Sequence, residues 1–354
     1  MNKIILVCEG LHNRAGIERM TVDLANLLSD EYEVMIVVID SFSYETCPFK
    51  INKKVKVVSL NTSFKKSFKN FNVPIIKALR KIFKEERPKA VITVATPLVR
   101  LTAPACFGLK IRNIAWEHFN IYAGSKMGTL FKTVAPWFVK NTVVLTKEDE
   151  RDYQVNYAPR VLTIPNFTNI GENLPSKCEK KVVLAVGRHA PQKGFDMLIK
   201  AWAKTDAPGW KLRIVGSGDD KQKNEQLAKN LGVWERIEFA EAHPGIAQEF
   251  QNASCFVLSS RFEGLVLVLI EAKMMGLPCI SFNCPNSPKE VIHNGKDGWL
   301  VPKEDIDALA KEMTLRLSNL EALKKAGEEG RKDALERYSP YAVKNEWIKL
   351  IGKR

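Results

Sequence analysis

Glu263 and Glu271 stand on either side of a nearly unbroken apolar run in the segment SSRFEGLVLVLIEAKMMGLPCI, residues 259–280. The apolar residues after Gly264 recur at the helical repeat, and the residues just before the segment are typical of a strand. We therefore expect a turn that carries Glu263 and then a helix whose second turn carries Glu271. Eight helical residues span about 12 Å, which matches the two ends of a sugar nucleotide, with its diphosphate at the helix N-terminus. The spacing also fits two surface glutamates on an amphipathic helix, which is the more common arrangement.

Two cations and one histidine are further candidates for chemistry. Arg188 directly follows the strand-like run VVLAVG (182–187), and Lys193 comes five residues later. Cations at such positions can neutralise phosphate charge without a metal ion. His118 ends the run NIAWEH (113–118). Taken singly, the cations also fit an ordinary charged surface, and the histidine a structural role.

The elements that would position these residues alternate between strand and helix along the whole chain. Strand-like runs in the first half cover 4–8, 34–40, 90–95, 113–118 and 142–147. Those in the second half cover 182–187, 211–216, 237–240, 255–260 and 278–282. Helix-length segments separate them, and this alternation builds parallel sheets with helices on both faces.

The pattern predicts an α/β protein of two doubly wound, Rossmann-like domains. The expected division is 1–165, a Pro- and Asn-rich linker at 166–180, a second domain at 181–336, and a final helical segment at 337–354. Ligands of open parallel sheets bind beyond the carboxyl ends of the strands. Two such sheets facing each other would form a central cleft, with candidate residues on both sides.

The chain resembles the retaining glycosyltransferases of family 4, which have the two-domain GT-B fold. Residues 259–280 are similar to the family's E-x7-E signature. The other similar segments are AVGRHAPQKGFDMLIKA (185–201), RIVGSGDD (213–220), NSPKEVIHNGKDGWLV (286–301), HNRAGIERM (12–20) and WEH (116–118). The resemblance spans essentially the whole chain and is more specific in the second half.

This resemblance implies a role for each matching residue. Arg188 and Lys193 would grip the donor diphosphate, while Glu271 would hold the ribose and Glu263 the hexose. His118 would lie beside the anomeric carbon and assist the transfer. The backbone positions implied in donor binding are Gly16, Gly216, Gly264, Leu265 and Val266. In the resembling fold the last helix crosses back onto the first domain.

The sequence departs from the family pattern at three places. Ala15 replaces the first glycine of the N-terminal loop, Val266 replaces a common proline, and Ser287 replaces the glycine before a proline. The triplet Asp305-Ile306-Asp307 could suggest a metal site, but it begins a helical pattern, where acidic residues cap the helix. We interpret it as a cap and expect neither a metal nor another cofactor.

The net charge of +14 is concentrated in the first half, where residues 1–165 carry 25 Lys and Arg against 15 Asp and Glu. Within residues 64–89, aromatic and basic side chains interleave: Phe64, Phe68, Phe71 and Phe83 with Lys65, Lys66, Lys69, Lys77, Arg80, Lys81 and Lys84. This composition fits an anionic surface, either phospholipid or nucleic acid. It also fits a solvated helix face whose apolar residues pack inward. The seven cysteines are scattered and odd in number, which favours a reducing compartment.

The leading interpretation is a metal-independent, retaining hexosyltransferase. It would transfer a hexose or N-acetylhexosamine from a UDP-linked donor to an undecaprenyl-linked or growing polysaccharide. Bacterial O-antigen, lipopolysaccharide or capsule synthesis would be the pathway, at the inner face of the cytoplasmic membrane, with residues 64–89 on the anionic lipid surface. One alternative is a sugar-nucleotide epimerase of the same fold, which needs no glycan acceptor. Another is a basic, non-catalytic nucleic-acid-binding protein, but such a protein has no evident use for the paired glutamates, so we expect no nucleic-acid partner.

Overall fold

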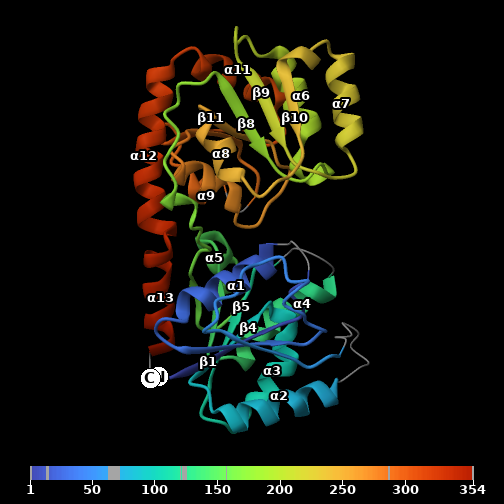
Figure 1. Cartoon of the computed structure of the whole chain (residues 1–354), viewed down its shortest axis with the longest axis vertical. Helices are drawn as coiled ribbons and strands as arrows, with labels where there is room; N and C mark the ends of the chain where they lie inside the picture. Colours follow the sequence, from blue (N-terminus) through green and yellow to red (C-terminus); the bar gives the residue numbers. More distant parts are fainter. Residues whose placement is uncertain are drawn as a thin grey trace. The chain divides into compact units, whose positions relative to one another are not determined.

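A computed structural model describes residues 2–12, 16–62, 72–119, 121, 126–156, 158–285 and 288–352. The chain divides into two compact units, Met1–Asn166 together with Val343–Arg354, and Phe167–Ala342. Each unit is built on one parallel sheet with helices around it (Figure 1). The α/β class and the two Rossmann-like sheets predicted from the strand–helix alternation are confirmed.

The first unit contains a seven-stranded sheet in the order β3-β2-β1-β4-β5-β6-β7. The strands are β1 Lys3–Cys8, β2 Glu33–Val38, β3 Lys56–Ser59, β4 Ala90–Val94, β5 Arg112–Trp116, β6 Asn141–Val144 and β7 Val161–Thr163. The helices are α1 Gly16–Leu28, α2 Val73–Glu86, α3 Val99–Cys106, α4 Lys126–Val134 and α5 Lys147–Val155, with 3-10 turns η1 Thr96–Leu98 and η2 Ala135–Phe138. The central strands are buried on both faces, which explains why their sequences are nearly continuous apolar runs.

The second unit contains a six-stranded sheet in the order β10-β9-β8-β11-β12-β13. The strands are β8 Val182–Val186, β9 Lys211–Val215, β10 Ile237–Ala240, β11 Cys255–Leu258, β12 Cys279–Phe282 and β13 Gly298–Val301. The helices are α6 Phe195–Lys204, α7 Lys221–Asn230, α8 Ile246–Gln251, α9 Leu267–Met274, α10 Pro288–Val291, α11 Ile306–Leu317 and α12 Leu320–Tyr338, with 3-10 turns η3 Ile170–Glu172, η4 Pro191–Lys193 and η5 Trp234–Arg236.

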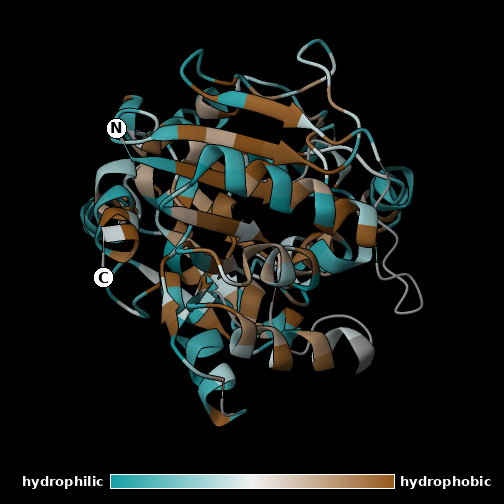
Figure 2. Ribbon diagram, turned by 90° about the horizontal axis from the view of Figure 1, so that it is seen from below, coloured by the Kyte–Doolittle hydropathy of each residue, from teal (hydrophilic) through white to brown (hydrophobic). Residues whose placement is uncertain are grey.

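Alternate side chains of β8 pack in two separate hydrophobic cores, one on each face of this sheet. Val183 and Ala185 pack in the core that includes α6 and α11. Leu184, between them, packs in the core that includes α9 and the end of α12. In the hydropathy colouring of Figure 2, the strands in view are mostly brown and the helices are striped brown and teal. The period of two along the strand therefore supplies apolar side chains to both layers.

Helix α2 is an amphipathic helix whose apolar side faces the sheet. Ile75, Leu79 and Phe83 are buried, the last at 1% exposure, against β1, β2, β4 and the neighbouring α3. Lys77, Lys81 and Lys84 are exposed. For this part of residues 64–89, Phe83 packs inward and the lysines lie on the exposed side, as in the solvated-helix alternative. Residues 64–71, with the other three phenylalanines, lie outside the described residues, as does Ala15.

The last two helices belong to different units. Helix α12 ends at Tyr338, and α13, Pro340–Gly352, begins after Ser339, so the final helix starts three residues later than the 337–354 segment expected from sequence. From Val343 onward the chain groups with the first unit. Trp347 is 1% exposed and meets Trp116 at the end of β5 edge to face, with ring centroids 5.4 Å apart.

Asp305 acts as the helix cap expected from the sequence. Its carboxylate accepts the backbone N–H of Ala308 at 2.9 Å, at the start of α11. A side chain in this role satisfies one of the free amides of the first helical turn. Asp305 is therefore the helix cap that the sequence predicted.

Candidate functional site

In the second unit, Glu263 and Lys193 form an ion pair beside the carboxyl end of β11. Lys193 Nζ donates to Glu263 Oε1 over 2.6 Å, and the two side chains are 19% and 7% exposed. Ser260 Oγ donates to the same oxygen at 2.5 Å, and Gln192 Nε2 donates to Oε2 at 3.3 Å. The spacing alone did not show that these two predicted residues meet, and it gave no sign of Ser260 or Gln192. The carboxylate is thus held in one orientation by donors from two loops.

A close backbone approach brings the two loops together. Gly194 has a positive φ of 63°, and a Cβ there would lie 2.1 Å from the carbonyl oxygen of Ser259. Ser259 Oγ also donates to the carbonyl of Lys193 at 2.9 Å. Only glycine fits at position 194, because any side chain would separate the Lys193 loop from the end of β11.

Glu271 lies in the second turn of α9, as the sequence predicted. It is 3% exposed, and Thr168 Oγ1 donates to its Oε1 at 3.4 Å. Helix α9 begins at Leu267 with Val266 as its N-cap, so Gly264 and Leu265 belong to the loop before it. The loop thus holds Glu263 and the helix holds Glu271, on the two sides of the helix N-terminus.

Arg188 and Gly216 follow the ends of the neighbouring strands β8 and β9. The Arg188 side chain is exposed, and its guanidinium has no ion pair with the described residues. A Cβ at Gly216 would lie 1.8 Å from the carbonyl oxygen of Gly187, so the fold itself requires glycine there. This backbone crossing, rather than room for a ligand, is the physical reason the structure gives for Gly216. It leaves Arg188 projecting at the strand end.

In the first unit, His118 lies two residues past the end of β5, where a carboxylate fixes the turn. Glu117 Oε1 accepts the backbone N–H groups of His118 and Phe119 at 2.9 and 3.0 Å, and Oε2 accepts the hydroxyl of Thr96. The His118 ring packs against Trp116, with centroids 4.3 Å apart. Burial lowers the pKa of His118 to about 3, so the imidazole is neutral at ordinary pH.

A cavity of about 460 Å³ opens at the same edge of the first sheet. Its lining includes Glu117, Lys132, Asp40 and Glu9, together with the exposed ring of Phe119. Strands β1, β4 and β5 all end here, as expected for a ligand site of an open parallel sheet. Gly16 is the first residue of α1, beside this edge, and a Cβ there would meet no atom of the described residues within 4 Å.

Comparison with known proteins gives the family. The model of the family described as "Glycosyl transferases group 1" matches residues 166–333. An undecaprenol-linked-glycan α-1,4-N-acetyl-D-galactosaminyltransferase of Campylobacter jejuni is 30% identical to the chain, over 100% of this chain and 99% of its own length. The chain belongs to the group 1 glycosyltransferases. An uncharacterized glycosyltransferase of Haemophilus influenzae is 29% identical over 99% of this chain and 100% of its own length.

A solved structure shows the same fold as this glycosyltransferase. The Anabaena HepE protein, in complex with UDP and glucose, superposes with a TM-score of 0.82 over 100% of both chains at 15% identity. That similarity, together with the two Rossmann-like sheets, establishes the GT-B fold. The paired glutamates, Arg188 and Lys193 all lie within the residues that the family model matches.

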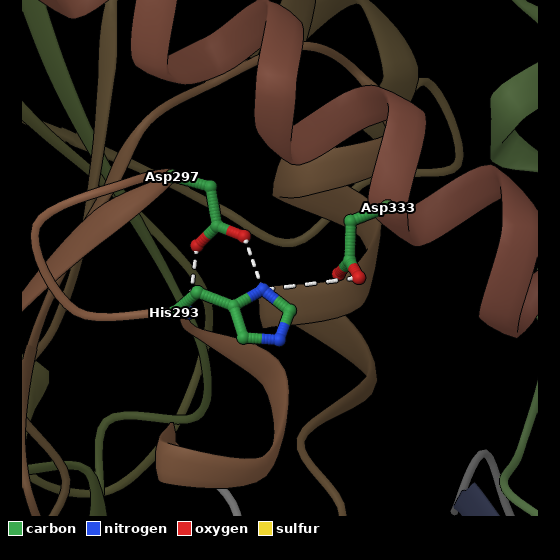
Figure 3. A group of neighbouring side chains, drawn as sticks. All are labelled: His293, Asp297 and Asp333. Atoms are coloured by element: carbon green, nitrogen blue, oxygen red, sulfur yellow. Dashed lines mark hydrogen bonds and ion pairs between the residues drawn. The ribbon is translucent and has the colours of Figure 1, made fainter.

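A third cluster in the glycosyltransferase has ligand types that a metal ion could use. His293, Asp297 and Asp333 offer atoms that lie within 4.8 Å of one another (Figure 3). The ammonium group of Lys273, however, already contacts Asp297 at 2.9 Å and Asp333 at 2.7 Å, and it donates to the carbonyl of Val291 at 2.5 Å. Lys273 is fully buried, so an internal cation balances these carboxylates. The cluster is structural rather than a metal site.

Sequence reasoning missed the residues that hold the site residues in place. Glu117, Lys273 and Thr168 stand in otherwise unremarkable positions, and no spacing rule links Thr168 to Glu271. A buried lysine two positions after a signature glutamate was the one available signal, since a charge within an apolar helix requires a partner.

Proposed function

We propose that this glycosyltransferase transfers a hexose or N-acetylhexosamine from a UDP-linked donor, with retention of anomeric configuration and without a metal ion. The observation that carries the proposal is the half-buried ion pair of Lys193 with Glu263, which lies eight residues before the buried Glu271. Arg188 and Lys193 would bind the donor diphosphate, and the amides around Gly264, Leu265 and Val266 would add further donors. The solved relative with bound UDP and glucose supports this nucleotide class.

Charge on the donor diphosphate increases as the glycosidic bond breaks. A cation near the leaving group therefore stabilises the transition state more than the ground state. Lys193 donates to Glu263, and a diphosphate would compete with Glu263 for this ammonium group. Binding would thereby free an oxygen of Glu263 for a sugar hydroxyl, which couples the two ends of the donor.

His118 would lie next to the reacting carbon as a neutral imidazole. Its lowered pKa makes it a hydrogen-bond partner rather than a cation at working pH. The orientation of the ring follows from the turn that Glu117 fixes. In this proposal Glu117 is a positioning residue, and the acceptor occupies the cavity that it lines.

The acceptor would be a lipid-linked or growing glycan of a bacterial surface polysaccharide, at the inner face of the cytoplasmic membrane. The name of the Campylobacter relative, which specifies an undecaprenol-linked glycan, supports this class of acceptor. Within the described residues, the structure contains no helix with the length and apolarity needed to cross a bilayer. Attachment would then be peripheral.

A donor panel tests this function. Purified enzyme is incubated with UDP-, GDP- and ADP-sugars, with and without EDTA, and release of the nucleoside diphosphate is measured. We expect one UDP-sugar to be turned over, at the same rate in EDTA. Arg188→Ala should lower kcat more than it raises KM. Glu271→Gln should weaken UDP binding about tenfold to a hundredfold, because a lost hydrogen bond to a charged group costs roughly 1.5–3 kcal/mol.

Lys200→Ala, an exposed lysine on α6, is the matched control for both variants and should behave as wild type. Unchanged UDP affinity in folded Glu271→Gln would refute the ribose role. Activity that disappears in EDTA and returns with Mg²⁺ or Mn²⁺ would refute the metal-independent mechanism.

A further inference from the structure

An exposed apolar surface covers α4 and η2 in the first unit. Leu130, Val134, Trp137 and Phe138 are 53%, 42%, 60% and 64% exposed. Positions 130, 134 and 137 are spaced by about one helical turn, so the side chains fall on one side of the segment. We call these four residues the α4–η2 surface. Solvent-exposed large apolar residues gathered within nine positions mark an interaction site.

The backbone under this surface is fixed rather than loose. Ala135 and Val139, on either side of the two aromatic residues, are buried in a core with Val99 of α3 and Ala115 of β5. The packing of these residues forces Trp137 and Phe138 outward. The backbone that carries Trp137 and Phe138 is therefore held by the packing of Ala135 and Val139.

The charge of the surrounding chain indicates the partner. Between Glu117 and Glu148 the sequence contains four lysines and no aspartate or glutamate; of these, Lys140 and Lys147 are exposed, whereas Lys132 is buried. Lys140 is exposed directly beyond the aromatic pair. Exposed Trp and Phe next to lysines, without acidic residues, is the composition of surfaces that insert into the headgroup region of anionic bilayers. Tryptophan in particular favours this interface, with an apolar ring and a polar N–H.

We propose that the α4–η2 surface docks on anionic phospholipid and holds the first unit at the membrane. This deepens the proposed function, because it rests on an acceptor presented at a membrane and names the part of the chain that contacts the lipid. It assigns the apolar contact to α4 and η2, since the described part of residues 64–89 buries Phe83 and exposes mainly lysines.

The test is sedimentation of the full chain with vesicles of phosphatidylglycerol and phosphatidylethanolamine, near physiological salt, against vesicles of phosphatidylcholine alone. Wild type should bind the anionic vesicles. The double variant Trp137→Ser/Phe138→Ser should lose at least tenfold in partitioning, and both side chains are exposed enough for the fold to tolerate the change. Phe107→Ser, an 81% exposed phenylalanine of the same unit, is the matched control and should bind as wild type.

A second measurement locates the tryptophan. Brominated lipids quench tryptophan fluorescence at short range, so wild type should be quenched more than Trp137→Phe, which retains the other six tryptophans. The inference is overturned if wild type does not bind, if the double variant binds equally, or if wild type without lipid forms a dimer that the double variant abolishes. The last result would assign the surface to a second copy of the chain.

The two proposals fail separately. Release of UDP from a soluble donor does not need the α4–η2 surface, so the double variant should retain wild-type donor hydrolysis. Vesicle binding without turnover of any nucleotide sugar would reject the proposed function and leave the lipid surface standing. Turnover without vesicle binding would reject the lipid-docking surface and leave the proposed function standing.

Discussion

Glu117 restricts the turn after β5 to one conformation, because a single carboxylate accepts two successive backbone N–H groups and a threonine hydroxyl. The residue that benefits is His118, whose Nε2 is buried and finds no hydrogen-bond partner in the described residues. A buried polar atom without a partner is costly and is often retained for function. In the proposed reaction this nitrogen would pair with a group of the substrate.

The lowered pKa of His118 predicts a pH dependence of stability. The pKa is about 3 in the folded chain against 6.5 when unfolded, so below about pH 6.5 the unfolded state binds a proton that the folded state does not. Stability from this group is present above pH 6.5 and is lost as the pH falls toward 3. The slope can reach about 1.4 kcal/mol per pH unit.

His118→Phe keeps an aromatic ring against Trp116 but cannot be protonated. Its free energy of unfolding, measured in urea at a series of pH values, should fall less steeply below pH 6.5 than that of wild type. Parallel profiles for the two proteins would show that His118 is protonated equally in both states, contrary to the burial argument.

At the level of elements, helix α9 is held by charge as well as by apolar packing. Lys273 of α9 forms ion pairs with Asp297, in the residues that precede β13, and with Asp333 of α12. Its ammonium group thereby links these three segments. Burial raises the pKa of Asp333, but the hydrogen bond and positive charge of Lys273, with Arg337 and His293 nearby, hold that pKa below its usual range. Glu271, two residues earlier on the same helix, is thereby fixed along the helix axis.

Lys273→Met should destabilise the second unit by about 3–5 kcal/mol, because it leaves Asp297 buried at 1% exposure without its cation. Lys273→Met/Asp297→Asn should recover part of this loss, since the uncompensated charge is gone. Lys296→Met is the matched control: its ion pair with Glu329, at 3.6 Å, is exposed and worth less than about 1 kcal/mol. Urea unfolding of the three variants gives the comparison. A loss for Lys273→Met no larger than the control's would show that the network carries no net stability.

The sequence predicted the long, buried elements well and the short or half-exposed ones poorly. β1, β4 and β8 are continuous apolar runs and were expected, whereas the short edge strands β3, β7 and β13 were not; β3 and β7 are only partly buried. The helix after Gly264 was expected, but its start at Leu267 depends on the extended backbone of Val266. The local sequence pattern cannot predict the backbone conformation of Val266, because the loop before α9 takes its geometry from packing against η4.

The candidate site was predictable where one segment carries its residues, and less so where loops meet. Glu263 and Glu271 follow from spacing, but the pairing of Glu263 with Lys193 depends on contact between segments 70 residues apart. The same limit applies to the α4–η2 surface. Its apolar spacing is that of a core helix, and only the tertiary structure shows that Leu130 and Trp137 point outward.

For the molecule as a whole, the chain ends in the unit where it began, and this ending supports the catalytic histidine proposed here. Trp347 of α13 packs on Trp116, and Trp116 in turn packs on His118. Lys344 adds an ion pair with Glu31 at 3.1 Å. A substitution in the last helix should therefore affect the first unit and the acceptor side of the reaction, but not the nucleotide side.

Trp347→Ala should lower the stability of the first unit by about 3–5 kcal/mol, as expected for truncating a fully buried aromatic side chain. It should also reduce transfer to acceptor, because the ring that supports His118 loses its own support. The affinity for UDP, which we place in the second unit, should stay at the wild-type value by calorimetry. Tyr341→Ala, a 76% exposed residue of the same helix, should change none of the three quantities. If Trp347→Ala weakened UDP binding as much as transfer, the two units would not be independent in this way, and the final helix would instead stabilise the enzyme as a single cooperative body.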